Sequence, residues 1–527
     1  MNLGKIFSLR FALWISGLFI ACCYSFISLP IHNNDANFYY KAAVLVSQGR
    51  FWDSVDIYYS PLLSWLMVPF LKVGFDFEES FRAVNFLAFL ITWFLLLDFA
   101  KRFESGRFEY FLVSLLVFSH QIFFMSSLVT SDYLTAAIFT AIWIELYKGK
   151  CFASWRGVVK LGSLGGISYY SKSIALIIFV AVLPVAIIYH FLKTGKLTCQ
   201  KDALLKGAAI SSMAILLSMP WMVAISAKVG QPVFSGQQFM LFKVSKEGTP
   251  SGPWSAGFSP ERVKYQKGIG EILRGRINTI KSAIQFLKKA RFLFCSVNIV
   301  LYFYLACIGI GAAVAISNRT HLFLPSIFSL IYISLYLLAW GGRLRYYAPV
   351  IALLDLLSFY GFQVAIGSLV NLVKGYENPF LTKVVVMLIG LFPLFVLVAN
   401  SLDASYKRAQ LYNGNIVKKA LKIRPLKNGK GKVAGNDYKG YAGLIALKLG
   451  REYGGVIEPY AVGDDPNALR RLVAENEIST IIWFGKPWKM LREVNFLKEY
   501  GPFSVKTGGK EEVFYIFELR KVKRSQG

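Results

Sequence analysis

Long apolar segments recur along roughly the first 400 residues, and they constrain the fold of this chain more than any other feature. Each segment is close to the ~20 residues that an α-helix needs to cross a bilayer. They predict helices at 9–29, 80–100, 108–127, 131–148, 157–170, 173–192, 203–226, 293–316, 321–340, 346–370 and 380–400. About eleven spans of this length describe a polytopic α-helical membrane protein.

The composition excludes a single soluble globule. Hydrophobic residues make up 55% of the chain and aromatic residues 16%, and the mean hydropathy is +0.48, so a soluble fold would expose large apolar patches. The formal net charge of +29 suggests nucleic acid at first sight. However, the Lys and Arg residues lie largely in short loops between apolar segments and in the polar C-terminal region, where they orient helices and face anionic lipid. We therefore expect membrane lipids, and no nucleic acid, as partners.

Basic residues in short loops predict the orientation of the helices. The loops at 101–107, 148–156, 193–201, 317–319 and 374–383 all carry Lys or Arg, which favours a cytoplasmic position for them. The extracytoplasmic side then receives loop 30–79, loop 228–290 and the C-terminal region. This order requires residues 157–192 to cross the inner or plasma membrane twice, because a single crossing would invert every later loop.

Beyond residue 400 the chain becomes polar, which predicts a division into a membrane domain at 1–400 and an extracytoplasmic domain at 401–527. The second domain shows helix-like stretches at 441–453, 466–476 and 488–500 and strand-like runs at 478–484 and 513–517. This alternation predicts a small α/β domain. It has no glycine-rich phosphate motif, so acceptor recognition and structural cover are both open roles. Within loop 30–79, the apolar stretch at 61–74 is too short to span a bilayer and predicts an interfacial helix.

Charged residues from distant parts of the sequence meet at the predicted extracytoplasmic ends of helices. They are Asp35, Asp132, Lys172, Arg343 and Arg345. Two carboxylates and three cations suit general base catalysis and neutralisation of a lipid phosphate. The alternative for each residue is that it merely reaches from the membrane interface into water.

Five short motifs occur in an informative order. They are Asp35 with Tyr39-Tyr40 and the later Tyr58–Leu63, then Ser131–Thr135, Gly165–Ser173, Met219-Pro220-Trp221 and Arg343–Pro349. Together they resemble motifs of the GT-C glycosyltransferases that use polyprenyl-phosphate sugars, such as protein O-mannosyltransferases, the aminoarabinose transferase of lipid A and galacturonosyltransferases of lipopolysaccharide core (families 39 and 83). The sequence departs from the family pattern at Ala36, where a second acid is frequent, and at Ser173, where the family has Gly.

The resemblance implies an integral-membrane, inverting glycosyltransferase that moves a hexosyl or pentosyl group from a polyprenyl-phosphate donor to a lipid, glycan or protein acceptor. Asp35 is then the candidate general base, and Asp132 orients the acceptor or a divalent cation. Lys172 and Arg345, with Arg343 in reserve, are the candidate ligands of the donor phosphate. The aromatic residues implied to line the substrate are Tyr39, Tyr40, Tyr59, Trp221 and Tyr346, although Tyr and Trp also anchor proteins at membrane interfaces.

Two other functions fit a bundle with charged residues. A lipid or sugar transporter or flippase predicts ionisable groups near the bilayer midplane and an internal repeat, and the sequence shows no repeat. A ligase or polymerase that uses a polyprenyl-diphosphate glycan predicts the same class of membrane site. The four His residues lack ligand spacing, so the sequence does not indicate a structural metal.

Overall fold

The computed structural model describes residues 34–100, 130–194, 200–235, 308–314, 323–339, 415–424, 429–436, 441–462, 465–507 and 510–520, with a few isolated positions between 350 and 364 and at 426. The chain divides into two compact units. The first comprises Met1–Ser28, Glu79–Trp221 and Ile269–Ser405, and the second comprises Leu29–Glu78, Met222–Gly268 and Tyr406–Gly527.

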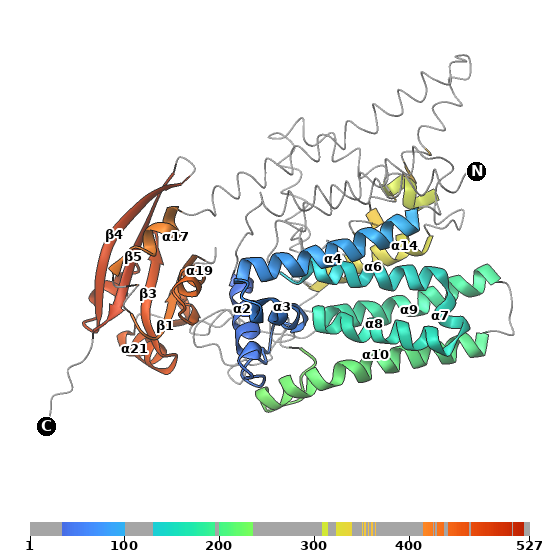
Figure 1. Cartoon of the computed structure of the whole chain (residues 1–527), viewed down its shortest axis with the longest axis horizontal. Coiled ribbons are helices and arrows are strands. Elements are labelled where there is room, and N and C mark those ends of the chain that lie inside the picture. Colours follow the sequence, from blue (N-terminus) through green and yellow to red (C-terminus); the bar gives the residue numbers. More distant parts are fainter. Residues whose placement is uncertain are drawn as a thin grey trace, which may run out of the picture. The chain divides into compact units, whose positions relative to one another are not determined.

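Most of the described first unit is helical (Figure 1). Its helices are α4 (Phe77–Ala100), α6 (Asp132–Lys148), α7 (Lys150–Ala153), α8 (Trp155–Ser171), α9 (Ser173–Thr194), α10 (Gln200–Val229) and α14 (Phe323–Ala339), and α4 and α10 extend into the second unit. The helices predicted at 80–100, 131–148, 157–170, 173–192, 203–226 and 321–340 are therefore confirmed. The predictions at 9–29, 108–127 and 380–400 lie outside the described residues, and those at 293–316 and 346–370 overlap them only in part.

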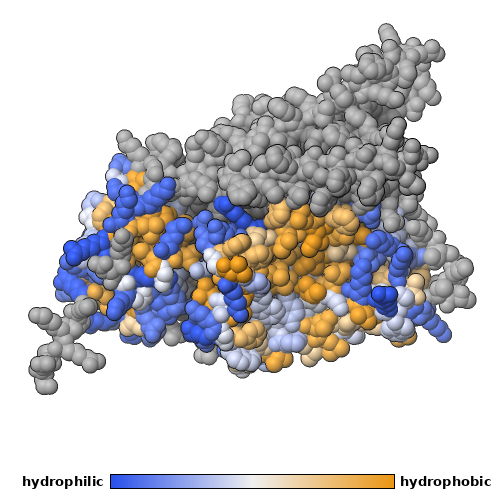
Figure 2. Space-filling view, viewed as in Figure 1, coloured by the Kyte–Doolittle hydropathy of each residue, from blue (hydrophilic) through white to orange (hydrophobic). Residues whose placement is uncertain are grey.

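Three helical segments in the described residues are long and apolar enough to cross a membrane: Phe77–Leu96, Ser173–Phe191 and Lys201–Val229. Their outer surfaces carry large exposed hydrophobic side chains, among them Ile91 and Phe94 on α4. Figure 2 shows a largely hydrophobic surface over the helices of the first unit and a more hydrophilic one over the sheet. A lipid environment explains exposed apolar side chains of this size, because water would make each of them costly.

Helices α8 and α9 form a hairpin around a single residue. Lys172 has an extended backbone (φ −158°, ψ 123°) and separates the two helices. Halfway along α8, Gly165 faces the ring of Phe179 on α9, and a Cβ at position 165 would lie 2.4 Å from that ring. Residues 155–194 therefore fold as two antiparallel helices, as the predicted topology requires.

Glycines on a second side of α8 allow α10 to approach closely. A Cβ at Gly162 would lie 2.9 Å from Met213, and one at Gly166 would lie 2.7 Å from Leu217. The four-residue spacing places both glycines on one face of the helix. Small residues at this spacing bring helix backbones together in membrane proteins, where packing replaces the hydrophobic effect between helices.

The described part of the second unit is built around a five-stranded sheet. The strands are β1 (Lys432–Gly435), β2 (Tyr453–Val456), β3 (Ile478–Phe484), β4 (Leu497–Thr507) and β5 (Lys510–Leu519), in the order β2-β1-β3-β5-β4. Strands β1, β2 and β3 are parallel, and β5 is antiparallel to β3 and β4. Parallel pairing beside an α-helical crossover is typical of the α/β domain that the sequence predicts.

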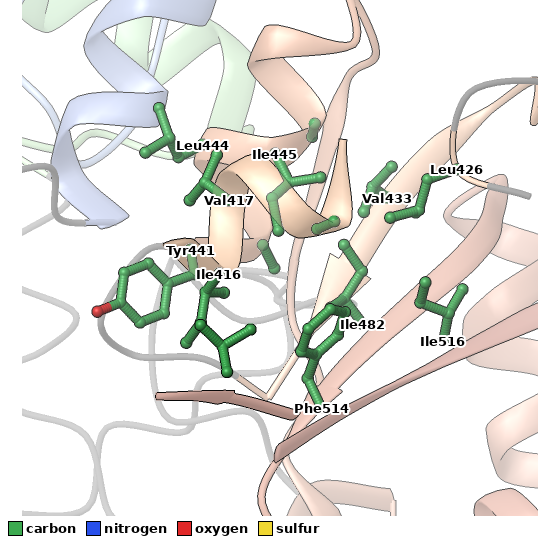
Figure 3. Close-up of a cluster of buried hydrophobic side chains, with 14 residues drawn as sticks. Ile416, Val417, Leu426, Val433, Tyr441, Leu444, Ile445, Ile482, Phe514 and Ile516 are labelled. Carbon is green, nitrogen blue, oxygen red and sulfur yellow. The ribbon is translucent and has the colours of Figure 1, made fainter. Parts of the chain in front are cut away.

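Helices cover both faces of this sheet. Short helices α17 (Asn415–Ala420) and α19 (Tyr441–Lys448) pack on one face, where Ile445, Ile482 and Phe514 belong to one buried cluster (Figure 3). Helices α21 (Pro466–Glu475) and α22 (Lys489–Glu493) pack on the other face around Ile481 and Phe517, and α20 spans Pro459–Val462. Adjacent Ile481 and Ile482 thus point to opposite faces, as the pleat of a strand requires.

One secondary-structure prediction in this domain is wrong. The helix expected at 488–500 ends at Glu493, and strand β4 begins at Leu497, which pairs with Leu519 of β5. The apolar residues between 490 and 494 have helical spacing. The following residues pair instead with the next strand, β5, in an antiparallel hairpin that closes at Thr507 and Lys510. Such pairing overrides the local helical pattern.

The predicted outer loop at 30–79 contains two helices. Helix α3 (Leu62–Lys72) agrees with the short helix expected at 61–74, whereas α2 (Asn34–Ser47) was not anticipated. Helix α2 contacts α19 of the sheet domain within the second unit. At this contact a Cβ on Gly443 would lie 1.8 Å from the amide nitrogen of Asn37, so the close approach depends on glycine.

Ion pairs join the sheet domain to α2 and to the start of α4. Lys41 on α2 pairs with Glu452, and Lys448 lies 3.6 Å from the carboxylate of Glu78. Burial raises the pKa of Glu452, but the hydrogen bond and charge of Lys41, with the charges of Lys432 and Arg50, outweigh it and leave this pKa below its ordinary value. The carboxylate of Glu452 therefore stabilises the folded second unit in its ionised form.

We predict that Glu452→Gln destabilises the protein in a pH-dependent way. Because the folded-state pKa is lowered, the stabilisation is fully present above the unfolded value of about 4.3 and is lost as the pH falls through the folded value. The measurement is the unfolding temperature of wild type and variant between neutral pH and pH ~3. Glu493→Gln is the control, because Glu493 is exposed and only pairs with exposed Lys489. A Glu452→Gln deficit that persists unchanged at the lowest pH contradicts this assignment.

Candidate functional site

A buried ion pair joins the start of α6 to the break between α8 and α9. The ammonium of Lys172 bonds one carboxylate oxygen of Asp132, and the hydroxyl of Thr130 donates to the other. The two side chains are only 13% and 2% exposed. A charge at this depth needs a partner, since an isolated buried ion costs several kcal/mol. The sequence predicted both residues for the site but did not predict that they would pair.

Local geometry explains how each partner reaches the pair. Asp132 lies in the first turn of α6, where the helix dipole favours a carboxylate. Lys172 is the one extended residue between α8 and α9. Its side chain therefore projects from the end of the hairpin and not from a helix face. The hydroxyl oxygens of Thr135 and Ser171 lie 3.2 Å apart, so the start of α6 packs directly against the end of α8.

Buried hydroxyl groups surround this pair. The buried polar residues near it are Thr130, Ser131, Thr135, Ser168, Ser171 and Ser173. Several of them satisfy their own helix, since Thr135 donates to the carbonyl of Ser131 at 2.8 Å and Ser171 to that of Ser168 at 2.7 Å. The pair and these hydroxyl groups together form a buried polar cluster where α6 begins and α8 ends.

Asp35 lies in the first turn of α2, in the second unit. One of its carboxylate oxygens accepts a 2.9 Å hydrogen bond from the hydroxyl of Tyr59. The ring of Tyr59 stacks on Phe38 at 5.1 Å and meets Tyr39 edge-on at 5.3 Å. Burial, followed by the charge of Asp35, holds the pKa of Tyr59 well above its ordinary value. The phenol therefore stays protonated and donates to Asp35 throughout the physiological range.

A turn that sequence reasoning missed positions Tyr59. The backbone N–H groups of Tyr58 and Tyr59 both donate to one carboxylate oxygen of Asp56, each at 2.8 Å. This is the Asx-turn geometry, in which an Asp side chain bonds the backbone two residues later. The Asp-x-Tyr-Tyr pattern at 56–59 is the sequence signal from which this turn could have been predicted.

The other predicted site residues fall into two groups. Tyr39 and Trp221 are buried, and Tyr40 is half-buried with its ring edge-on to Phe77 at 4.8 Å. Arg343, Arg345 and Tyr346 lie outside the described residues, so their roles stay predictions. The structure thus joins Asp132 with Lys172 in the first unit and Asp35 with Tyr59 in the second.

The described contacts of Asp132 are with a cation and a hydroxyl group. Both of its carboxylate oxygens already accept hydrogen bonds, from Lys172 and Thr130. Over the described ranges there is no group of three or more His, Cys, Asp or Glu side chains placed to hold a metal ion.

We predict strong energetic coupling between Asp132 and Lys172. Asp132→Asn or Lys172→Met alone leaves one partner buried without its counter-ion and should destabilise the protein by about 3–5 kcal/mol. The double variant should lose much less than the sum, since no unpaired charge remains. Unfolding of the purified protein in detergent measures all three. The matched control is Lys489→Met with Glu493→Gln, an exposed pair for which additive effects below ~1 kcal/mol are expected. Additive losses at Asp132 and Lys172 would refute the coupling.

Comparison with known proteins adds to this geometry at the level of the fold. No family model matches the chain, and no curated protein matches it in sequence. In three dimensions it is similar to ArnT from Cupriavidus metallidurans bound to undecaprenyl phosphate, with a TM-score of 0.54, 12% identity and 98% of each chain covered. It is also similar to the Archaeoglobus fulgidus oligosaccharyltransferase in complex with zinc and sulfate, with a TM-score of 0.53, 11% identity, and 89% of this chain and 67% of that chain covered. Both are GT-C fold glycosyltransferases, and the chain shares the GT-C fold that its motifs predict.

Proposed function

We propose that the chain is an inverting glycosyltransferase of the cell membrane. It moves a hexosyl or pentosyl group from a polyprenyl-phosphate donor to a lipid, glycan or protein acceptor on the extracytoplasmic face. The observation that carries this proposal is the buried Asp132–Lys172 pair at a break between membrane helices. The GT-C fold supports it, because one protein of similar structure is bound to undecaprenyl phosphate.

In the proposed reaction Lys172 binds the donor phosphate. An ammonium has three N–H donors, so Lys172 can keep its bond to Asp132 and donate to a phosphate oxygen as well. Asp132 fixes the position of the ammonium before the donor arrives, and such preorganised charge is the main source of catalysis when negative charge grows. Arg345, with Arg343 in reserve, is the proposed bidentate partner for the same phosphate.

Asp35 is the proposed general base. Its carboxylate takes the proton of the acceptor hydroxyl or amine while the acceptor atom forms a bond to the anomeric carbon. The bond between that carbon and the phosphate oxygen breaks, and the polyprenyl phosphate leaves with the electron pair. Attack on the side opposite the leaving group inverts the anomeric centre. The hydrogen bond from Tyr59 holds the carboxylate of Asp35 in one orientation.

We expect Asp35→Asn to yield a folded, membrane-inserted protein whose transfer rate is lower by about 10²–10⁴-fold, the usual contribution of a general base. The assay follows lipid release from polyprenyl-phosphate and polyprenyl-diphosphate sugars by the purified protein. Glu475→Gln, an exposed carboxylate on α21, is the control and should retain activity.

Three results would contradict the proposal, two from this assay and one from a vesicle transport assay. Near wild-type activity in Asp35→Asn removes Asp35 from the mechanism. Turnover of diphosphate donors alone identifies a ligase or polymerase. Movement of labelled lipid across vesicles without release of a sugar identifies a transporter or flippase.

A second prediction concerns Tyr59 as a positioning residue. Tyr59→Phe removes the hydrogen bond to Asp35 and keeps the ring contacts. Without this donor the carboxylate can rotate away from the acceptor, so kcat should fall while the acceptor KM stays close to the wild-type value. Tyr515→Phe, a ring in strand β5 of the sheet, is the control. If Tyr59→Phe lowers the unfolding temperature and leaves kcat unchanged, its role is only structural.

A further inference from the structure

The second unit contains a cleft that the proposed reaction does not yet use. Its volume is about 790 Å³, and it lies between α2 with the following loop and the edge of the sheet domain formed by α19 and β2. This volume falls in the range of about 300–1,000 Å³ that small-ligand sites usually have. Five cations and three carboxylates contribute to its lining, so a polar ligand suits it and a prenyl chain does not.

Asn37 in the wall of the cleft marks a binding site. Its side chain is only 6% exposed, and among the described residues neither its amide oxygen nor its amide nitrogen has a hydrogen-bond partner. An unsatisfied buried polar group destabilises a folded protein, so its presence calls for an explanation. An amide both donates and accepts, which matches a hydroxyl group that does the same.

Most charges that line the cleft neutralise one another. Lys41 pairs with Glu452, the amine of Lys432 lies 3.2 Å from the carboxylate of Glu477, and the guanidinium of Arg50 lies 2.8 Å from that of Asp53. These pairs give the cleft a polar wall with donors and acceptors, but no net charge.

Two further cations remain after this pairing. Within the described part of the chain, neither Lys228 nor Arg451 forms an ion pair with a carboxylate. Lys228 bonds the carbonyl oxygen of Val55. Arg451 donates to the carbonyl oxygens of Leu426, Lys430 and Gly431 and to the hydroxyls of Ser479 and Thr480 at 2.7 and 2.8 Å. The cleft therefore carries a surplus of positive charge, which favours an anionic ligand.

We infer that this cleft binds a saccharide of the acceptor that carries a phosphate or carboxylate group. The sugar hydroxyls satisfy Asn37, and the anionic group meets Lys228. The aromatic side chains of Phe38 and Tyr40 in the lining offer apolar surface to a sugar ring. The identification of this saccharide as the acceptor rests on the proposed function, whereas its binding does not.

The cleft is linked to the proposed base through α2. Asn37 follows Asp35 by two residues, a rise of about 3 Å along the helix. Phe38 lines the cleft and stacks on Tyr59, whose hydroxyl bonds Asp35. A saccharide in the cleft therefore lies against the same helix turn that carries the base.

Binding to the full-length protein without donor tests the inference. Calorimetric titration uses maltose 1-phosphate and a glucuronyl-glucose disaccharide as anionic probes, with maltose and inorganic phosphate as references. We expect at least one anionic disaccharide to bind at least tenfold more tightly than maltose and than inorganic phosphate. Failure of both disaccharides to bind overturns the inference. So does equal affinity for maltose or for phosphate alone, since the latter indicates an anion site that ignores the sugar.

Variants of the lining sharpen the test. Asn37→Leu keeps the shape of the side chain and removes the unsatisfied amide, so affinity should fall at least tenfold while the unfolding temperature stays the same or rises. Lys228→Met should weaken binding of the anionic disaccharide at least tenfold. Lys489→Met, an exposed cation on α22, is the control and should bind like wild type. Unchanged affinity in Asn37→Leu and Lys228→Met overturns the site, and a lower unfolding temperature in Asn37→Leu shows that its amide is structural.

The two proposals fail separately. If binding requires Asn37 and Lys228 but the protein transfers no sugar, the proposal for the cleft stands and the proposed transferase activity is refuted. If transfer depends on Asp35 but Asn37→Leu leaves the acceptor KM unchanged, the proposed transferase activity stands and the proposal for the cleft is refuted.

Discussion

The arrangement of the first unit depends on the buried pair between Asp132 and Lys172. A lysine at this depth is tolerated only with its counter-ion, so the pair fixes the start of α6 against the break between α8 and α9. The break brings α8 and α9 side by side, and Gly165 lets α8 approach Phe179 of α9. Gly166 likewise lets α8 approach Leu217 of α10. Sequence features that look unrelated, a carboxylate, a lysine and a row of glycines, thus serve one geometric requirement.

The second unit solves a different problem, which is how to hold a short helix outside the apolar segments. Helix α2 gains its support from the sheet domain through the Lys41–Glu452 pair and from the glycine at 443 that lets Asn37 approach α19. The same helix carries Asp35, so the domain that steadies α2 also steadies the proposed base. The unsatisfied amide of Asn37 weakens this support, which is a cost that a ligand-binding role explains and a purely structural role does not.

Local pattern predicted those parts of the fold that local pattern controls. Long apolar runs indicated α4, α6, α8, α9 and α10, and short apolar runs indicated β3 and β5. Helix α2 and strand β4 were missed because packing partners, and not local periodicity, determine them: α2 packs on α3 and α19, and β4 pairs with β5. At the site, the sequence predicted Asp35, Asp132 and Lys172 as candidates. The bonds of Lys172 to Asp132 and of Tyr59 to Asp35 span 40 and 24 residues, and no local signal encodes them.

The pairing of Lys172 also bears on how the proposed transfer gains its rate. A lysine without a counter-ion would bind the donor strongly before reaction, and binding of the ground state alone does not accelerate a chemical step. Paired with Asp132, the ammonium is largely neutralised and attracts the singly charged phosphodiester only weakly. As the bond to the anomeric carbon breaks, the leaving phosphate gains a second negative charge, and the ammonium can respond without moving. The ion pair therefore directs the attraction of Lys172 toward the transition state, which is where it lowers the barrier.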